Sequence, residues 1–98
     1  MAAYDWLLKG LSLMHKLTEQ DTRAALECFE HAIEADKKYA RAHAFASWCY
    51  RRRVQQGGLT LSDRDRNRAV TLARQALQLD RSDPYVLVYS ATTIEWLE

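Results

Sequence analysis

The chain has 98 residues, a formal net charge of +1 and 48% hydrophobic residues, which suits one small domain with a modest core and excludes a disordered tail. The near-neutral charge gives no overall reason to bind nucleic acid or a membrane surface, and no apolar run is long enough to span a bilayer. The charge is uneven, however: residues 1–50 sum to −1, residues 51–81 to +5 and residues 82–98 to −3.

Five helices are predicted in chain order, so the fold class is all-α. The apolar residues follow helical spacing over residues 3–16, 19–35, 40–56, 63–79 and 84–97. Gly57 and Gly58 end the third helix, because glycine readily takes the left-handed conformation found there. The segment Leu-Thr-Leu at 59–61 carries no helical pattern and is expected in a loop.

Three helix starts carry their own signals. Thr18 and Ser62 each precede an aspartate by three residues, which is the capping-box pattern with Asp in place of Glu. Ser82 or Asp83 is expected to cap the last helix. Pro84 then falls in the first turn, where proline loses no hydrogen bond.

One pattern of small and large residues recurs along the chain. The second and fourth helices match at a spacing of 44 residues, where positions 25, 29, 32 and 36 correspond to 69, 73, 76 and 80. The third and fifth helices match at the same spacing, and the first and third helices match at a spacing of 37. Such repetition is typical of stacked helix pairs, because one pair alone cannot bury its apolar face. Small side chains are predicted where antiparallel helices cross closely, namely Gly10, Ala25, Ala32, Ser47, Ala69 and Ala76.

This pattern resembles the tetratricopeptide repeat. It reads Gly-Leu-Ser-Leu at 10–13, Ala-Leu-Glu-Cys-Phe-Glu-His-Ala at 25–32, Asp-Lys at 36–37, Ser-Trp-Cys-Tyr at 47–50 and Ala-Val-Thr-Leu-Ala-Arg-Gln-Ala at 69–76. The resemblance implies a right-handed α-solenoid of antiparallel helix pairs in a single domain, residues 1–98. Its units would be repeat 1 at 3–36, repeat 2 at 40–80 with a long internal turn at about 55–63, and the first helix of repeat 3 at 84–97.

The second unit departs from the family pattern at two residues and in the length of its internal turn, where ten extra residues lie within roughly 55–68. Ala73 stands where an aromatic residue is usual, and Arg81 replaces the proline of the turn, as Lys37 does in the first unit. More narrowly, residues 3–21 leading into residues 28–50 resemble the repeat arrays attached to bacterial class III nucleotide cyclases and to some winged-helix regulators. That likeness implies a fragment of a larger cytoplasmic signalling protein.

The resemblance implies that the chain binds a peptide or protein segment in the concave groove made by the first helix of each unit. Phe45, Trp48 and Arg52 share one helix face, and aromatic rings beside arginines are typical of binding hot spots. Phe45 could equally be core, whereas Trp48 is expected in the groove. The predicted groove residues are Leu7, Leu11, Arg41, Phe45, Trp48, Arg51, Arg52, Tyr85 and Tyr89. The alternative is a structural or oligomerisation segment whose groove is filled by its own chain.

Catalysis and cofactor binding are not predicted. Cys28 and His31 stand three residues apart, but a zinc site usually needs four ligands, and no catalytic set or phosphate-binding loop is identifiable. Cys28 and Cys49 are expected as buried thiols in a reducing compartment. The arginines at 51–53, 64, 66 and 68 are interpreted as solvated helix ends rather than a nucleic-acid site.

The last helix also predicts a homodimer. Leu87, Ala91 and Ile94 form an apolar stripe at helical spacing, and no helix after residue 98 is present to cover it. Burial of such a stripe stabilises an interface, so two copies are expected to associate through this helix in a concentration-dependent manner.

Overall fold

The computed structural model describes residues 2–16, 18–57 and 61–98, apart from the side chains of residues 55–57. Its helices are α1 (Ala3–Met14), α2 (Glu19–Ala35), α3 (Ala40–Gly57), α4 (Asp63–Leu79) and α5 (Pro84–Leu97). The described residues outside them lie in turns, bends or irregular segments, with no strand among them. The prediction of an all-α fold with five helices is confirmed.

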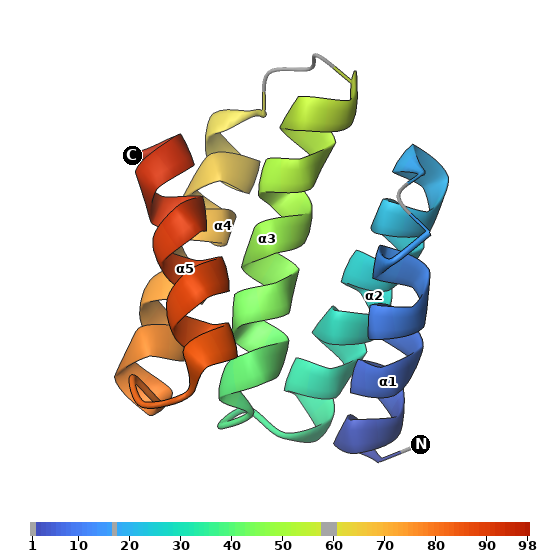
Figure 1. Ribbon diagram of the computed structural model, residues 1–98, viewed down its shortest axis with the longest axis vertical. Coiled ribbons are helices and arrows are strands. Elements are labelled where there is room, and N and C mark those ends of the chain that lie inside the picture. Colours follow the sequence, from blue (N-terminus) through green and yellow to red (C-terminus); the bar gives the residue numbers. More distant parts are fainter. Residues whose placement is uncertain (1, 17, 58–60) are drawn as a thin grey trace.

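Consecutive helices run antiparallel, with α3 in the middle, α1 and α2 on one side and α4 and α5 on the other (Figure 1). α3 packs on α2, α4 and α5, and α4 packs on α5. α1 packs on α2 but makes little direct contact with α3. The first and third helices are therefore further apart than the third and fifth.

The predicted caps determine where α2, α4 and α5 begin. The Thr18 hydroxyl oxygen accepts a bond of 3.0 Å from the Asp21 backbone amide and donates one of 2.7 Å to the Asp21 carboxylate. At α2 the Asp21 carboxylate bonds the capping hydroxyl, whereas the Asp5 carboxylate of α1 accepts a bond of 3.2 Å from the Ala2 backbone amide, as Glu does in a capping box. Ser62 caps α4 through the same backbone contact, at 3.1 Å. Asp83, not Ser82, caps α5.

Two predicted helix ends were wrong by one or two residues. α1 ends at Met14 rather than Lys16, because the Lys16 amide bonds the carbonyl only three residues back, which tightens the last turn. α3 extends to Gly57, and Gly58 and the next two residues of the expected loop lie outside the described residues. Leu61 is outside any helix, and its side chain is only 8% exposed.

The spacing of 44 residues recurs in the helix bounds. α2 and α4 begin and end 44 residues apart, and α3 and α5 also begin 44 apart. Asp36 and Asp80, again 44 apart, close α2 and α4 in similar extended conformations, and each carboxylate accepts a bond from the backbone amide two residues on. The two helix–turn–helix segments thus share their local geometry as well as their sequence pattern.

The small residues predicted at the helix crossings are buried. The side chains of five of them are 0% exposed, namely Ala25, Ala32, Ser47, Ala69 and Ala76. At the sixth, Gly10, an added Cβ atom would lie 2.5 Å from Cε1 of Phe29. Phe29 is itself fully buried and packs on Phe45, with 5.5 Å between ring centroids. The α1–α2 crossing therefore has no room for a side chain at Gly10.

Both cysteines are buried free thiols, as predicted. Burial raises the pKa of the Cys49 thiol and also that of the Cys28 thiol. No helix in the described ranges is long and apolar enough to cross a membrane.

Candidate functional site

A hollow of about 290 Å³ opens on the face formed by α1, α3 and α5. One wall comes from the end of α1, which stands away from α3, and the floor and other wall come from α3 and α5. The lining is largely apolar and aromatic, with two basic side chains: Leu11, Met14, His15, Arg41, Phe45, Tyr85 and Tyr89. Its volume suits one or two large side chains of a ligand.

The structure brings five of the nine predicted groove residues to this hollow: Leu11, Arg41, Phe45, Tyr85 and Tyr89. Trp48 and Arg52 follow Phe45 along the same face of α3, beyond the hollow. Arg51 lies against α5 through its contact with Trp96. Leu7 is only 3% exposed and belongs to the core rather than to the hollow.

Aromatic rings connect α3 to α5 along this face. Phe45 and Tyr89, which stand 44 residues apart, meet edge to face with 5.0 Å between centroids, and Trp48 meets Tyr89 at 5.7 Å. Phe45 is 3% exposed yet lines the hollow, so it serves as core and as floor together. Trp48 is half-buried and packs against the core, so its ring is not free of structural contacts.

Arg41 already has a carboxylate partner within the chain. Its Nε lies 2.5 Å from the carboxylate of Asp83, the residue that caps α5, and its guanidinium carbon lies 4.9 Å from the Tyr85 ring centroid. The hydrogen bond with Asp83 is the main cause that raises the pKa of Arg41. Sequence reasoning missed this partner, although the 44-residue spacing pairs Arg41 with Tyr85, two residues from Asp83.

Arg51 and Arg52 lie over tryptophan rings at the other end of this face. The guanidinium carbons are 5.1 Å from the Trp96 centroid and 5.7 Å from the Trp48 centroid, respectively. Both Nε atoms are buried and have no hydrogen-bond partner among the described residues. Burial, with the neighbouring Arg52 charge, lowers the pKa of Arg51. These are two cations held by aromatic contacts rather than by carboxylates.

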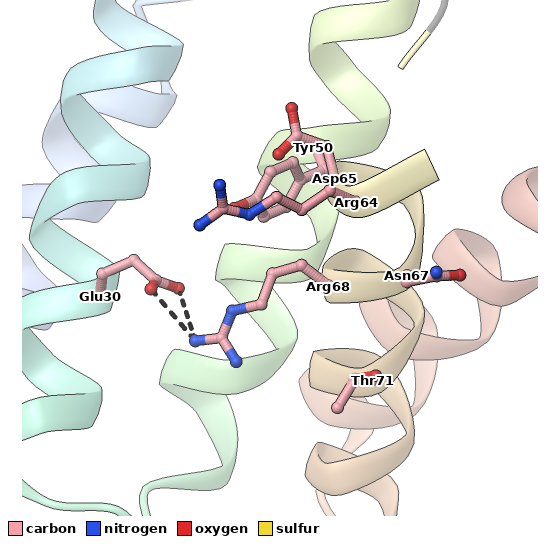
Figure 2. A pocket seen from close by; sticks show the side chains of 7 residues that line it. All are labelled: Glu30, Tyr50, Arg64, Asp65, Asn67, Arg68 and Thr71. Atoms are coloured by element: carbon pink, nitrogen blue, oxygen red, sulfur yellow. Dashed lines mark hydrogen bonds and ion pairs between the residues drawn. The ribbon is translucent and has the colours of Figure 1, made fainter. Parts of the chain in front are cut away.

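A second hollow, of about 460 Å³, lies on the opposite face between α2 and α4. Figure 2 shows Glu30 of α2 pointing across it toward Arg68 of α4, with Tyr50 of α3 above them beside Arg64. The two charged groups form an ion pair of 3.1 Å, and their side chains are 38% and 40% exposed. Although larger, this hollow is more polar and is crossed by its own ion pair, so we favour the α1–α3–α5 face as the binding surface. The hollow between α2 and α4 was not predicted from the sequence, because its two walls are far apart in the chain.

Two other basic side chains of α4 are used within the fold. Arg66 donates a bond of 2.8 Å to the Leu97 carbonyl at the end of α5, and Arg74 forms an ion pair with Glu98. The Arg74–Glu98 ion pair joins the basic middle segment of the chain to its acidic C-terminal segment. This arrangement supports the structural interpretation of these arginines.

No protein-family model, curated protein or solved structure matches this chain. Within the described ranges, no group of three or more His, Cys, Asp or Glu side chains is arranged to hold a metal ion. His31 instead stacks on Trp6, with 4.4 Å between ring centroids. The candidate site is therefore defined by its geometry alone.

Proposed function

We propose that the chain is a right-handed α-solenoid of the tetratricopeptide type and that it binds a peptide or protein segment along the face of α1, α3 and α5. The observation that carries this proposal is the hollow on that face, which gathers aromatic, aliphatic and basic side chains from three helices that are separate in sequence. Concave, mostly apolar sites with a few polar groups are the usual form of a binding pocket.

The same proposal gives the chain a supporting role in a larger protein. It would serve as an interaction module in a cytoplasmic bacterial signalling protein, such as one with a nucleotide cyclase or winged-helix domain. The described side chains offer apolar surface and hydrogen-bond donors to a partner rather than a set of reacting groups. Binding would then need neither a cofactor nor catalysis by this chain.

A specific observation favours the alternative, a structural or oligomerisation segment. Arg41 is occupied by Asp83, and Phe45 and Trp48 pack into the core, so part of the predicted groove is filled by its own chain. Under this alternative the hollow would bind no peptide from a partner. The two functions therefore differ in whether an exposed residue at the rim of the hollow affects partner binding.

Tyr85 allows a test that separates binding from folding. Its side chain is 53% exposed and lines the hollow, so Tyr85→Ala should change stability little but weaken a partner that fills the site. Asn67→Ala, on the exposed opposite face, is the matched control. Pull-downs from the source organism should recover a partner with the wild type and with Asn67→Ala but not with Tyr85→Ala. Equal recovery by all three would favour the structural alternative.

A further inference from the structure

The face of α3 that forms the groove has an apolar hollow toward one end of the helix and arginine side chains toward the other. Arg41, Phe45, Trp48 and Arg52 follow the spacing i, i+4, i+7 and i+11, so they share one face of the helix. The hollow lies at the Arg41 and Phe45 end. The cations that contact tryptophan lie at the Arg52 end.

The two ends of this face differ in how strongly they attract a carboxylate on a ligand. Asp83 already neutralises Arg41, so the hollow itself has little attraction for a second acid. In contrast, no carboxylate of the described residues lies within 4.0 Å of Arg51 or Arg52. An acidic side chain there would gain charge-assisted hydrogen bonds from two guanidinium groups whose orientation is fixed by the rings beneath them.

The distance between the two ends limits the shape of the ligand. Phe45 and Arg52 are seven residues apart, which is about 10 Å along an α-helix. In a β-strand, side chains on one side repeat at about 7 Å or 13 Å. In a polyproline II segment they repeat every three residues, at about 9 Å. Of these two extended conformations, only polyproline II has a spacing that matches the α3 face, and grooves lined with aromatic rings are typical receptors for such segments.

We propose that the bound segment adopts a polyproline II conformation, places a large apolar side chain in the α1–α3–α5 hollow, and places an Asp or Glu three residues away against Arg51 and Arg52. This inference rests on the proposed function and specifies the chemistry of the partner. The aromatic contacts Phe45–Tyr89 and Trp48–Tyr89 form the floor between the two positions. The residues in between would lie across that floor, where proline is favoured because it fixes the extended conformation.

A series of synthetic peptides tests the spacing directly. Each fluorescein-labelled decapeptide carries one Leu and one Glu in a background of Pro and Ser, with Glu one to five residues from Leu on either side. Fluorescence anisotropy with the full 98-residue chain should show the tightest binding at a separation of three. In one of the two directions, that peptide should bind about tenfold tighter than its Lys counterpart. Equal affinity for Glu and Lys, or a best separation of one, two, four or five, would overturn the inference.

Charge variants then assign the acid to the arginines. Arg51→Gln with Arg52→Gln should reduce the preference for Glu over Lys from about tenfold to near one, and should leave the affinity of a peptide with Leu alone unchanged. The matched control is Arg64→Gln, an exposed arginine at the opposite hollow, which should keep the preference. Circular dichroism checks that each variant is folded. If the double variant is unfolded, the preference for Glu over Lys is measured instead in Arg52→Lys and in the wild type at increasing salt concentration. A preference for Glu that does not change with salt contradicts the inference.

The failure of the inference can be distinguished from the failure of the proposed function. Peptides that bind without any preference for acid, and lose affinity in Tyr85→Ala, would preserve the groove and reject the acidic partner. If no peptide at millimolar concentration shifts the amide resonances of residues that line the hollow, both proposals are rejected. An acid preference that is retained by the Arg51 and Arg52 variant would place the acid elsewhere and also reject the inference.

Discussion

The contact between Gly10 and Phe29 predicts that a normally stabilising substitution will destabilise this protein. Glycine inside a helix costs about 1 kcal/mol relative to alanine, so Gly10→Ala should stabilise α1 if there were space for the methyl group. There is none, since the added carbon would lie 2.5, 2.8 and 2.9 Å from three atoms of the Phe29 ring. Carbon atoms pack at about 3.5–4.0 Å, so the ring would have to retreat by about 1 Å.

That retreat is opposed by the core. Phe29 is 0% exposed and rests on Phe45, so the ring cannot swing into solvent. Overpacking of this kind costs about 1–3 kcal/mol. After subtraction of the gain in helix propensity, Gly10→Ala should lower the free energy of unfolding by about 1 kcal/mol, with a range from zero to about 2. For a domain of this size, 1 kcal/mol corresponds to a Tm lower by about 4–8 °C.

The sign of the effect should depend on residue 29. In a Phe29→Leu background, two of the three closest ring atoms are absent, and Gly10→Ala should become neutral or stabilising by up to about 1 kcal/mol. Urea denaturation of the four proteins in this double-mutant cycle measures the coupling. Ser12→Ala, on the exposed side of α1, is the control for propensity alone and should stabilise slightly. Equal stabilisation by Gly10→Ala in both backgrounds would refute the close crossing.

Three further predictions concern the crossings, the cap and the last helix. Ala32→Leu should cost about 1–3 kcal/mol by overpacking a fully buried position, and an unchanged Tm would contradict the crossing there. Asp83→Ala should cost about 0.5–2 kcal/mol through loss of the α5 cap, whereas Asp83→Asn should retain most of that stability in thermal melts. Light scattering should show weak, concentration-dependent dimers that disappear in the Leu87→Glu, Ile94→Glu double variant, and a wild type that stays monomeric at high concentration would reject this interface.

Helix existence and most helix ends could be predicted because their causes are local. Thr18 and Ser62 satisfy backbone amides three residues on, and Pro84 fixes the first turn of α5. These interactions depend on residues adjacent in the sequence, so the predicted bounds of α2, α4 and α5 agree with the structure. α1 lacked such a signal at its end, and its last turn was predicted two residues too long.

The site could be predicted only in part because its closest contacts join distant residues. The resemblance predicted Arg41, Phe45, Tyr85 and Tyr89 in one groove, and these four side chains line the same hollow. The repeat pattern could not indicate that Asp83 forms an ion pair with Arg41, because that contact depends on how far the two side chains extend rather than on their spacing in the sequence. The separation of α1 from α3, which opens the hollow, also has no sequence signal that we identify.

Comparison of α3 with α5 explains both the open stripe and the expected weakness of a dimer. In α3, the positions 44 residues before the stripe are His43, Ser47 and Tyr50, and they are 4%, 0% and 9% exposed within the packed bundle. In α5 the equivalent Leu87 is 43% exposed, Ala91 is exposed and Ile94 is half-buried. A 14-residue helix offers about 21 Å by 10 Å, or roughly 200 Å², on one side. Stable complexes bury about 800 Å² per partner, so this stripe alone should support association only at high concentration.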